Sequence, residues 1–174
     1  MARRKLARLL ALGVALMAAR SALAAGTGGC ESFEFPLVTE LQWMKADEAL
    51  AATSGTKLEA LPAKAVALTL LPTAQVTFEV PPTGKRKNKP EDAFAASLGF
   101  TIAEPGLYQI SLSGPGWVDV IQNGAALKST AHTGKSDCEG LRKSVRFDLV
   151  AGPVTIQLAD VPAAQIRLTI RKAD

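Results

Sequence analysis

The chain has 174 residues, with 20 basic residues, 16 acidic residues and one histidine, His132. Because one imidazole cannot build a two-histidine iron site, a three-histidine zinc site or an H-E-x-x-H motif, these metal sites are excluded within one chain. Gly-rich phosphate loops, C-x-x-C pairs and EF-hand spacing are also absent from the sequence. We therefore predict no metal and no cofactor.

The first 24 residues have the pattern of a secretory signal peptide. A positively charged start precedes an apolar run over 9–19 and the small-residue site Ala22-Leu23-Ala24, so we expect cleavage before Ala25 and a single domain over 25–174. The apolar run is shorter than the roughly 20 residues needed to cross a bilayer. We expect a periplasmic or secreted protein without a transmembrane segment in the mature chain; an uncleaved anchor is the alternative.

The basic character of the precursor belongs mainly to this signal. Five of the 20 basic residues and none of the 16 acidic ones lie in it, which leaves 15 basic residues against 16 acidic residues. The charge balance therefore does not indicate a nucleic-acid partner. A basic cluster at 85–89 is expected to be a solvated loop, with an anion-binding patch as the alternative, because no aromatic residue lies among its cations.

The two cysteines, Cys30 and Cys138, both lie in the exported part. Oxidising conditions outside the cytoplasm favour pairing, so we expect one disulfide that ties the mature N-terminus to a late loop. The alternative is acylation of Cys30, because the small residues Thr27-Gly28-Gly29 precede it as in a lipoprotein. That alternative would leave Cys138 unpaired.

Short runs of alternating apolar residues, separated by Pro and Gly, predict an all-β fold. An antiparallel β-sandwich or jelly roll is expected, because two packed sheets bury one face of each strand. One short N-terminal helix is expected over 38–52 behind a Thr39 cap. The candidate strands are 66–71, 75–80, 94–102, 107–113, 117–122, 143–149, 154–158 and 165–170.

The last three candidate strands show the clearest alternation. Their short connections predict an antiparallel meander, with Val145/Phe147/Leu149 and Val154/Ile156/Leu158 at the centre of the core. Asn123-Gly124 predicts a type I′ hairpin that returns the 117–122 strand onto a strand through Leu127.

The segment 128–143 is rich in polar residues and is expected to be a long loop or loop pair. A Ser-His-Asp relay could combine Ser129 or Ser136 with His132 and with Asp119 or Asp137. No Gly-x-Ser-x-Gly elbow supports such a relay, and these residue types are also common in loops. We therefore predict no catalytic residue and expect His132 to be a surface residue.

A binding site is the other use for these residues. Trp117 follows a Gly-Pro-Gly turn, where an indole can stack on a sugar ring or close one end of the sandwich. Asp119 interrupts an apolar strand, so we expect it to face solvent or to pair with Arg142 or Arg146. The candidate binding residues are Trp117, Asp119, Lys128, His132, Asp137, Arg142 and Lys143.

Five segments together resemble a family of small exported bacterial proteins. They are 106–112, 117–120, 126–129, 138–147 and 152–155, and the stretch from Cys30 to Glu40 resembles the N-terminal part of the same family. Some members carry the label homogentisate 1,2-dioxygenase, which implies a ring-cleaving, non-haem iron enzyme. Dioxygenases of that name are longer cupin proteins with two histidine ligands and one glutamate ligand. With His132 alone, no iron ligand carries over to this chain.

Two hypotheses of different classes follow. The first is a non-catalytic exported binding or accessory module, with a ligand or cell-envelope partner that the sequence does not identify. The alternative is a homogentisate dioxygenase-type oxygenase or a small hydrolase that uses the segment 128–143. We expect no oxygenase turnover of homogentisate, because a 2-His-1-carboxylate site needs two imidazoles.

Overall fold

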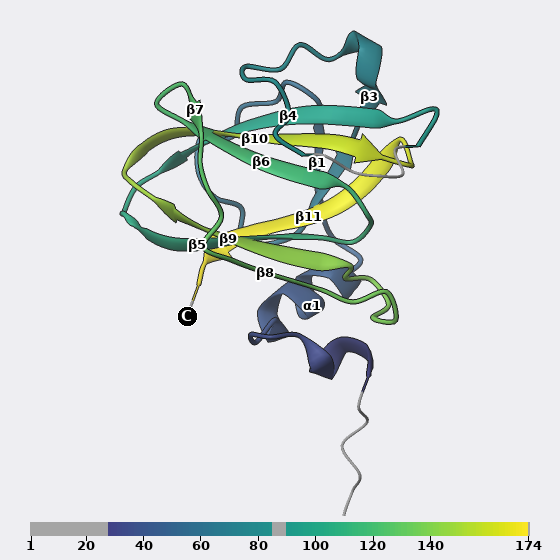
Figure 1. The fold of residues 1–174 in the computed structure, drawn as a ribbon. Helices are drawn as coiled ribbons and strands as arrows, with labels where there is room; N and C mark the ends of the chain where they lie inside the picture. Colours follow the sequence, from purple (N-terminus) through teal and green to yellow (C-terminus); the bar gives the residue numbers. More distant parts are fainter. Residues whose placement is uncertain (1–27, 85–89, 174) are drawn as a thin grey trace, which may run out of the picture.

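The computed structural model describes residues 28–84 and 90–173, which form two β-sheets packed face to face with one α-helix (Figure 1). The predicted all-β sandwich with a short N-terminal helix is thereby confirmed. The proposed signal peptide and the basic cluster at 85–89 lie outside the described residues.

Each sheet draws its strands from distant parts of the chain. The six-stranded sheet has the order β1 (Leu50–Thr53), β2 (Val66–Thr69), β11 (Gln165–Lys172), β5 (Gly106–Leu112), β9 (Lys143–Leu149) and β8 (Ala131–Gly134). The five-stranded sheet has the order β3 (Leu71–Pro72), β4 (Phe94–Ile102), β10 (Gly152–Val161), β6 (Trp117–Gln122) and β7 (Ala125–Ala126). Among these named strands, only β1 and β2 pair in parallel.

The core lies between the two sheets and contains both predicted apolar triplets. Val145, Phe147 and Leu149 are buried on β9, and Val154, Ile156 and Leu158 are buried on β10. The alternation of each strand places these side chains inward. Their burial was correctly predicted from the sequence.

The predicted meander of the last three strands is wrong. β9 pairs with β5 and β8, whereas β10 pairs with β4 and β6 in the other sheet, and β11 returns to pair with β5 and β2. The two triplets therefore meet across the sandwich rather than side by side. The bend at Gly152 (φ 127°) lets the chain leave one sheet and enter the other, because glycine tolerates this backbone conformation.

The predicted helix over 38–52 is too long. Helix α1 covers Val38–Lys45, and Leu37 rather than Thr39 occupies its N-cap position without a side-chain cap. The following segment becomes β1, because it finds a hydrogen-bonding partner in β2 at the edge of the sheet. Local helical spacing is thus overridden by tertiary strand pairing.

The predicted strand over 75–80 is also wrong. A short 3-10 helix, η2 (Thr73–Gln75), is followed by irregular backbone. The side chain of Gln157 supplies the hydrogen bonds that a neighbouring strand would otherwise supply: its Oε1 accepts from the backbone N–H groups of Glu79 and Val80, and its Nε2 donates to Val80 O. We call residues 73–84 the strap, because it covers the outer face of the five-stranded sheet (Figure 1).

Three other predictions concern turns, loops and strand bounds. The Asn123-Gly124 hairpin is confirmed, with both residues at positive φ and with β6 paired to β7. The predicted loop 128–143 is only partly a loop, because β8 lies within it and pairs with β9. The candidate strand 66–71 is split between β2 and β3, which lie in different sheets.

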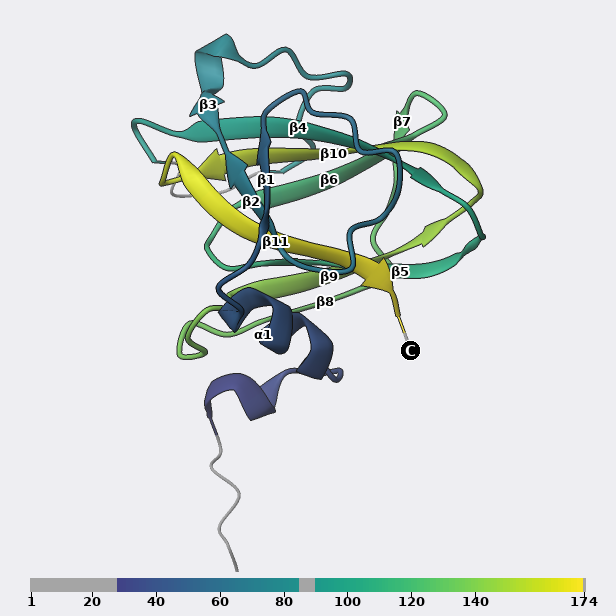
Figure 2. The ribbon, with the colours of Figure 1, turned by 180° about the vertical axis from the view of Figure 1, so that it is seen from behind.

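An N-terminal cap, residues 28–46, covers the outer face of the six-stranded sheet (Figure 2). It contains η1 (Gly29–Ser32) and α1, and the predicted disulfide joins its Cys30 to Cys138. Leu37 and Met44 of the cap are buried with Cys138 and Leu141 in a second, smaller apolar cluster. The cap and the strap thus cover the outer faces of opposite sheets.

Candidate functional site

A pocket of about 300 Å³ lies where β6 of one sheet approaches β8 and β9 of the other. We call it the edge pocket. Residues from the strap, β6, the β7–β8 connection, β8 and β9 line it: Thr83, Trp117, Val118, Asp119, Leu127, Lys128, Ser129, His132, Lys143, Val145 and Phe147. Segments separated by about sixty positions in the sequence therefore meet at one place.

A second hollow of about 300 Å³, the rim groove, adjoins the edge pocket. The two share Trp117, His132 and Lys143, and the rim groove adds Arg142 and the turn at Pro115-Gly116. Six of the seven predicted binding residues thus line one of two neighbouring hollows. Ligand binding by them remains a prediction.

The indole of Trp117 is held in a fixed orientation. Its Nε1 donates a hydrogen bond of 2.9 Å to Asp119 Oδ1. Gly84 lies against the ring so closely that a Cβ there would come within 2.3 Å of the indole, so only glycine fits. The Lys143 ammonium lies 5.6 Å from the ring centroid and donates to Gly116 O at 3.1 Å. An aromatic ring fixed in this way is a preorganised surface for a ligand.

Asp119 is buried, with a relative exposure of 4%, which corrects the expectation that it faces solvent or pairs with Arg142 or Arg146. Its Oδ2 accepts from the backbone N–H of Thr83 at 3.0 Å, and its Oδ1 accepts from the Thr83 hydroxyl and from the Trp117 indole. The strap supplies the two Thr83 donors, β6 itself supplies the Trp117 indole, and no local sequence signal places the strap over β6. Asp119 therefore positions Trp117.

Positive charge surrounds the opening of the two hollows. Lys128 is exposed, and Arg142 and Lys143 are partly exposed; the exposed His132 imidazole lies beside them and is not counted as a charge. The exposed position of His132 agrees with the prediction that it is a surface residue. Among the residues that line the two hollows, Asp119 is the one carboxylate against three lysine and arginine side chains.

Asp137 does not join this site. It is exposed and accepts a hydrogen bond of 2.8 Å from the backbone N–H of Gly29, in the N-terminal cap. That backbone hydrogen bond lowers the pKa of the Asp137 carboxyl, because it stabilises the charged form. Asp137 thus helps to attach the cap next to the disulfide and lines neither of the two hollows, and ligand binding by it stays a prediction.

The imagined Ser-His-Asp relay is not assembled. Ser129, His132 and Asp119 line the same pocket, but the Asp119 carboxylate is directed to Thr83 and Trp117 rather than to the imidazole. Asp137 binds the cap. The base of such a relay needs an orienting carboxylate, and neither candidate aspartate supplies one.

The iron site that the dioxygenase label implies does not fit the residues present. Across 28–84 and 90–173, no three His, Cys, Asp or Glu side chains are grouped closely enough to hold a metal ion. The facial site of such an enzyme needs two imidazoles and a carboxylate. His132, the one imidazole of the chain, lies beside cations at the edge pocket.

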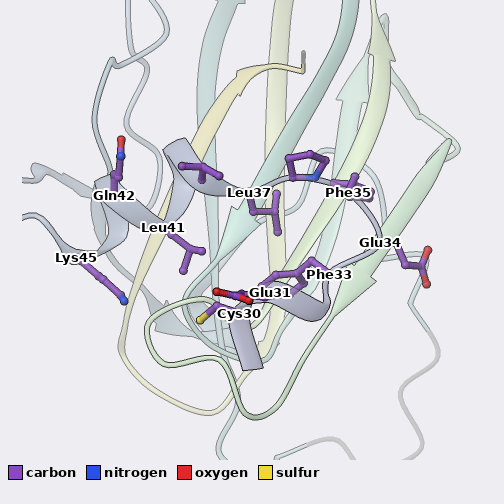
Figure 3. A pocket seen from close by; sticks show the side chains of 11 residues that line it. Cys30, Glu31, Phe33, Glu34, Phe35, Leu37, Leu41, Gln42 and Lys45 are labelled. Atoms are coloured by element: carbon purple, nitrogen blue, oxygen red, sulfur yellow. The ribbon is translucent and has the colours of Figure 1, made fainter. Parts of the chain in front are cut away.

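A larger hollow of about 580 Å³ lies within the N-terminal cap (Figure 3). The side chains of Phe33, Leu37 and Leu41 gather near Cys30, whereas Glu34 points away from them. One continuous stretch, 30–45, forms all its walls, and the same apolar side chains attach the cap to Cys138 and Leu141. We therefore assign this hollow to the packing of the cap.

A buried polar network under the cap was missed by the sequence analysis. Glu40 of α1 is 1% exposed; it accepts from Gln109 Nε2 and lies 3.4 Å from Arg171 Nε. Gln109 Oε1 in turn accepts from Arg146 Nε at 3.0 Å, and the Arg146 guanidinium lies 3.8 Å from the Phe35 ring centroid. The network joins the cap to β5, β9 and β11 of the sheet, and the buried Glu40 charge has the partners that a buried charge requires.

Two comparisons of the sequence with known proteins found no match. No protein-family model matches the chain. A search of curated proteins also found no match. The function must therefore be argued from the geometry of the edge pocket.

Proposed function

We propose that the protein is an exported, non-catalytic binding module that takes a ligand in the edge pocket. The observation that carries this proposal is the fixed indole of Trp117 beside a pocket with an apolar interior and a polar, cationic opening. Small-molecule sites commonly combine apolar walls with a few placed polar groups, and their volumes begin near 300 Å³.

The polar groups of the pocket support binding rather than catalysis. Asp119, its one carboxylate, accepts three hydrogen bonds that hold Thr83 and Trp117 in place. A carboxylate so engaged is a positioning group and is poorly suited to remove a proton. Positioning of an aromatic ring is the expected use of such a group in a recognition site.

Two features support export, one from the sequence and one from the structure. The first 24 residues have the signal-peptide pattern, and the Cys30–Cys138 disulfide suits an oxidising compartment. In the part of the chain that the structure describes, no helix is long and apolar enough to cross a membrane. We therefore propose a periplasmic or secreted location, with the signal cleaved before Ala25.

The experiment is an NMR screen of the isotope-labelled, disulfide-bonded protein against a mixture of small neutral, cationic and anionic organic probes. We expect chemical-shift changes to gather at the Trp117 indole, Lys128 and His132. The substitution Ser129→Trp places bulk in the pocket lining and should abolish these changes. Ser136→Trp is the matched control, because Ser136 is exposed and lines neither hollow.

Two outcomes would overturn the proposal. The first is a set of shift changes that avoids the edge pocket or is unaffected by Ser129→Trp. The second is oxygen uptake with homogentisate by iron-supplied protein that disappears in a His132→Ala variant, which would establish the oxygenase alternative. Oxygen uptake that is equal in both proteins would identify a contaminating enzyme and would leave the binding proposal in place.

A further inference from the structure

The interior of the edge pocket is apolar. Val118, Val145 and Phe147 belong to the sandwich core, and Leu127 packs against that core from the β7–β8 connection. These side chains are apolar and carry no hydrogen-bonding group; Val118, Val145 and Phe147 are nearly fully buried at the base of the pocket, and Leu127 is partly exposed. A ligand that reaches them must therefore carry an apolar part, because burying an unpaired polar group there is unfavourable.

The opening of the pocket has the opposite character. The Lys128 ammonium is exposed there, and the Arg142 guanidinium lies in the adjoining rim groove. The Asp119 carboxylate is buried under the strap and engaged by Thr83 and Trp117. A cationic ligand would thus meet like charges at the opening, whereas an anionic ligand would meet opposite charges.

The size of the pocket limits the apolar part. A volume of about 300 Å³ is at the lower end of the range for ligand sites, so the ligand is a small molecule. A lipid with two acyl chains is too large to enter. Trp117 beside the opening adds an aromatic surface whose indole N–H is already bonded to Asp119.

We infer that the edge pocket binds a small organic anion with an apolar body, such as a short-chain carboxylate, with the body against Val118, Leu127 and Phe147 and the charge toward Lys128. This inference rests on the proposed binding function and names the class of its ligand.

The test uses four probes that separate the two parts of the ligand: hexanoate, hexan-1-ol, hexylammonium and acetate. Each is titrated into the labelled, disulfide-bonded protein at low ionic strength, and Kd is obtained from the shifts at the pocket. We expect hexanoate to bind about tenfold tighter than hexan-1-ol, hexylammonium and acetate, because it alone satisfies both the apolar interior and the cationic opening.

A charge-removing variant tests the role of the opening. Lys128→Gln should raise the Kd for hexanoate about two- to fivefold, in keeping with a partly solvated ion pair, and should leave the Kd for hexan-1-ol unchanged. Lys45→Gln is the matched control, because Lys45 is exposed on α1 and does not line the edge pocket. Its Kd values should equal those of the unmodified protein.

The outcomes separate the two proposals. If hexan-1-ol or hexylammonium binds the pocket as tightly as hexanoate, the pocket is a binding site but the anion inference is wrong. If acetate binds as tightly as hexanoate, the apolar interior has no part in recognition and the inference is also wrong. If no probe of this series and none of the broader screen shifts the pocket signals, both the anion inference and the proposed binding function are wrong.

Discussion

At the scale of single residues, buried polar side chains organise this molecule. Asp119 ties the strap to β6, Gln157 ties it to β10, and Glu40 ties the cap to the six-stranded sheet. Each side chain is almost fully buried and bonded to a segment far away in the sequence. Buried polar groups are stabilising only when such partners are present. These residues therefore depend on long-range contacts that no local pattern reveals.

Asp119 provides the residue-scale prediction. Asp119→Ala should lower the free energy of unfolding by about 1 to 3 kcal/mol, because donors on Thr83 and Trp117 lose their acceptor. Denaturant unfolding followed by circular dichroism measures the change, and the tryptophan emission of the folded protein should also shift. Asp148→Ala is the control, since Asp148 is exposed on β9. Equal stability of the two variants would contradict the positioning role of Asp119.

At the scale of elements, strands were predicted well where side-chain alternation and turn residues agree. β4, β6 and β9 have the predicted bounds, because one face of each strand is buried in the core. The prediction failed for 75–80, where the alternation is similar but the Gln157 side chain binds the backbone. Alternation of apolar side chains indicates that one face of a segment is covered. It does not indicate whether a neighbouring strand or a side chain makes the hydrogen bonds to the segment's backbone.

Phe147 on β9 provides the element-scale prediction. It is 2% exposed, and Phe147→Ala should lower the free energy of unfolding by about 3 to 5 kcal/mol through lost burial and a residual cavity. Chemical denaturation measures this change. Val150→Ala, at a position that is 53% exposed just after the same strand, should change stability by less than about 0.5 kcal/mol. A loss below about 1 kcal/mol for Phe147→Ala would show that β9 presents the wrong face to the core.

At the scale of the whole molecule, two segments outside the sheets cover the outer faces of the sandwich: the cap, which contains α1, and the strap, which has no regular strand. The cap is held by the disulfide, an apolar cluster and the Glu40 network, and the strap is held by hydrogen bonds to Gln157 and Asp119. The strap also completes the edge pocket through Thr83. The candidate site therefore depends on the correct placement of a segment that has no regular strand structure.

The disulfide provides the whole-molecule prediction. It joins residues 108 positions apart, so the double variant Cys30→Ser/Cys138→Ser should lose about 2 to 4 kcal/mol of unfolding free energy. A reducing agent should destabilise the unmodified protein by a similar amount and should leave the double variant unaffected. Mass spectrometry checks the linkage directly. Free thiols in freshly isolated protein, or a lipid on Cys30, would contradict it.

The sequence by itself determined the fold class, the buried faces of the main strands, the Asn123-Gly124 hairpin and the pairing of the two cysteines. These features follow from local alternation, turn chemistry and a cysteine count of two. The sequence also selected six residues that line the two neighbouring hollows, because Trp117 follows a turn, Asp119 interrupts an apolar strand and the other four lie in the polar segment 128–143. Tertiary structure alone decided which sheet each strand joins, where α1 ends and what Asp119 contacts. The physical reason is that strand placement, the end of α1 and the contacts of Asp119 all depend on residues distant in the sequence. The hydrogen bonds and burial that those residues supply outweigh the local preference of a segment for helix or strand.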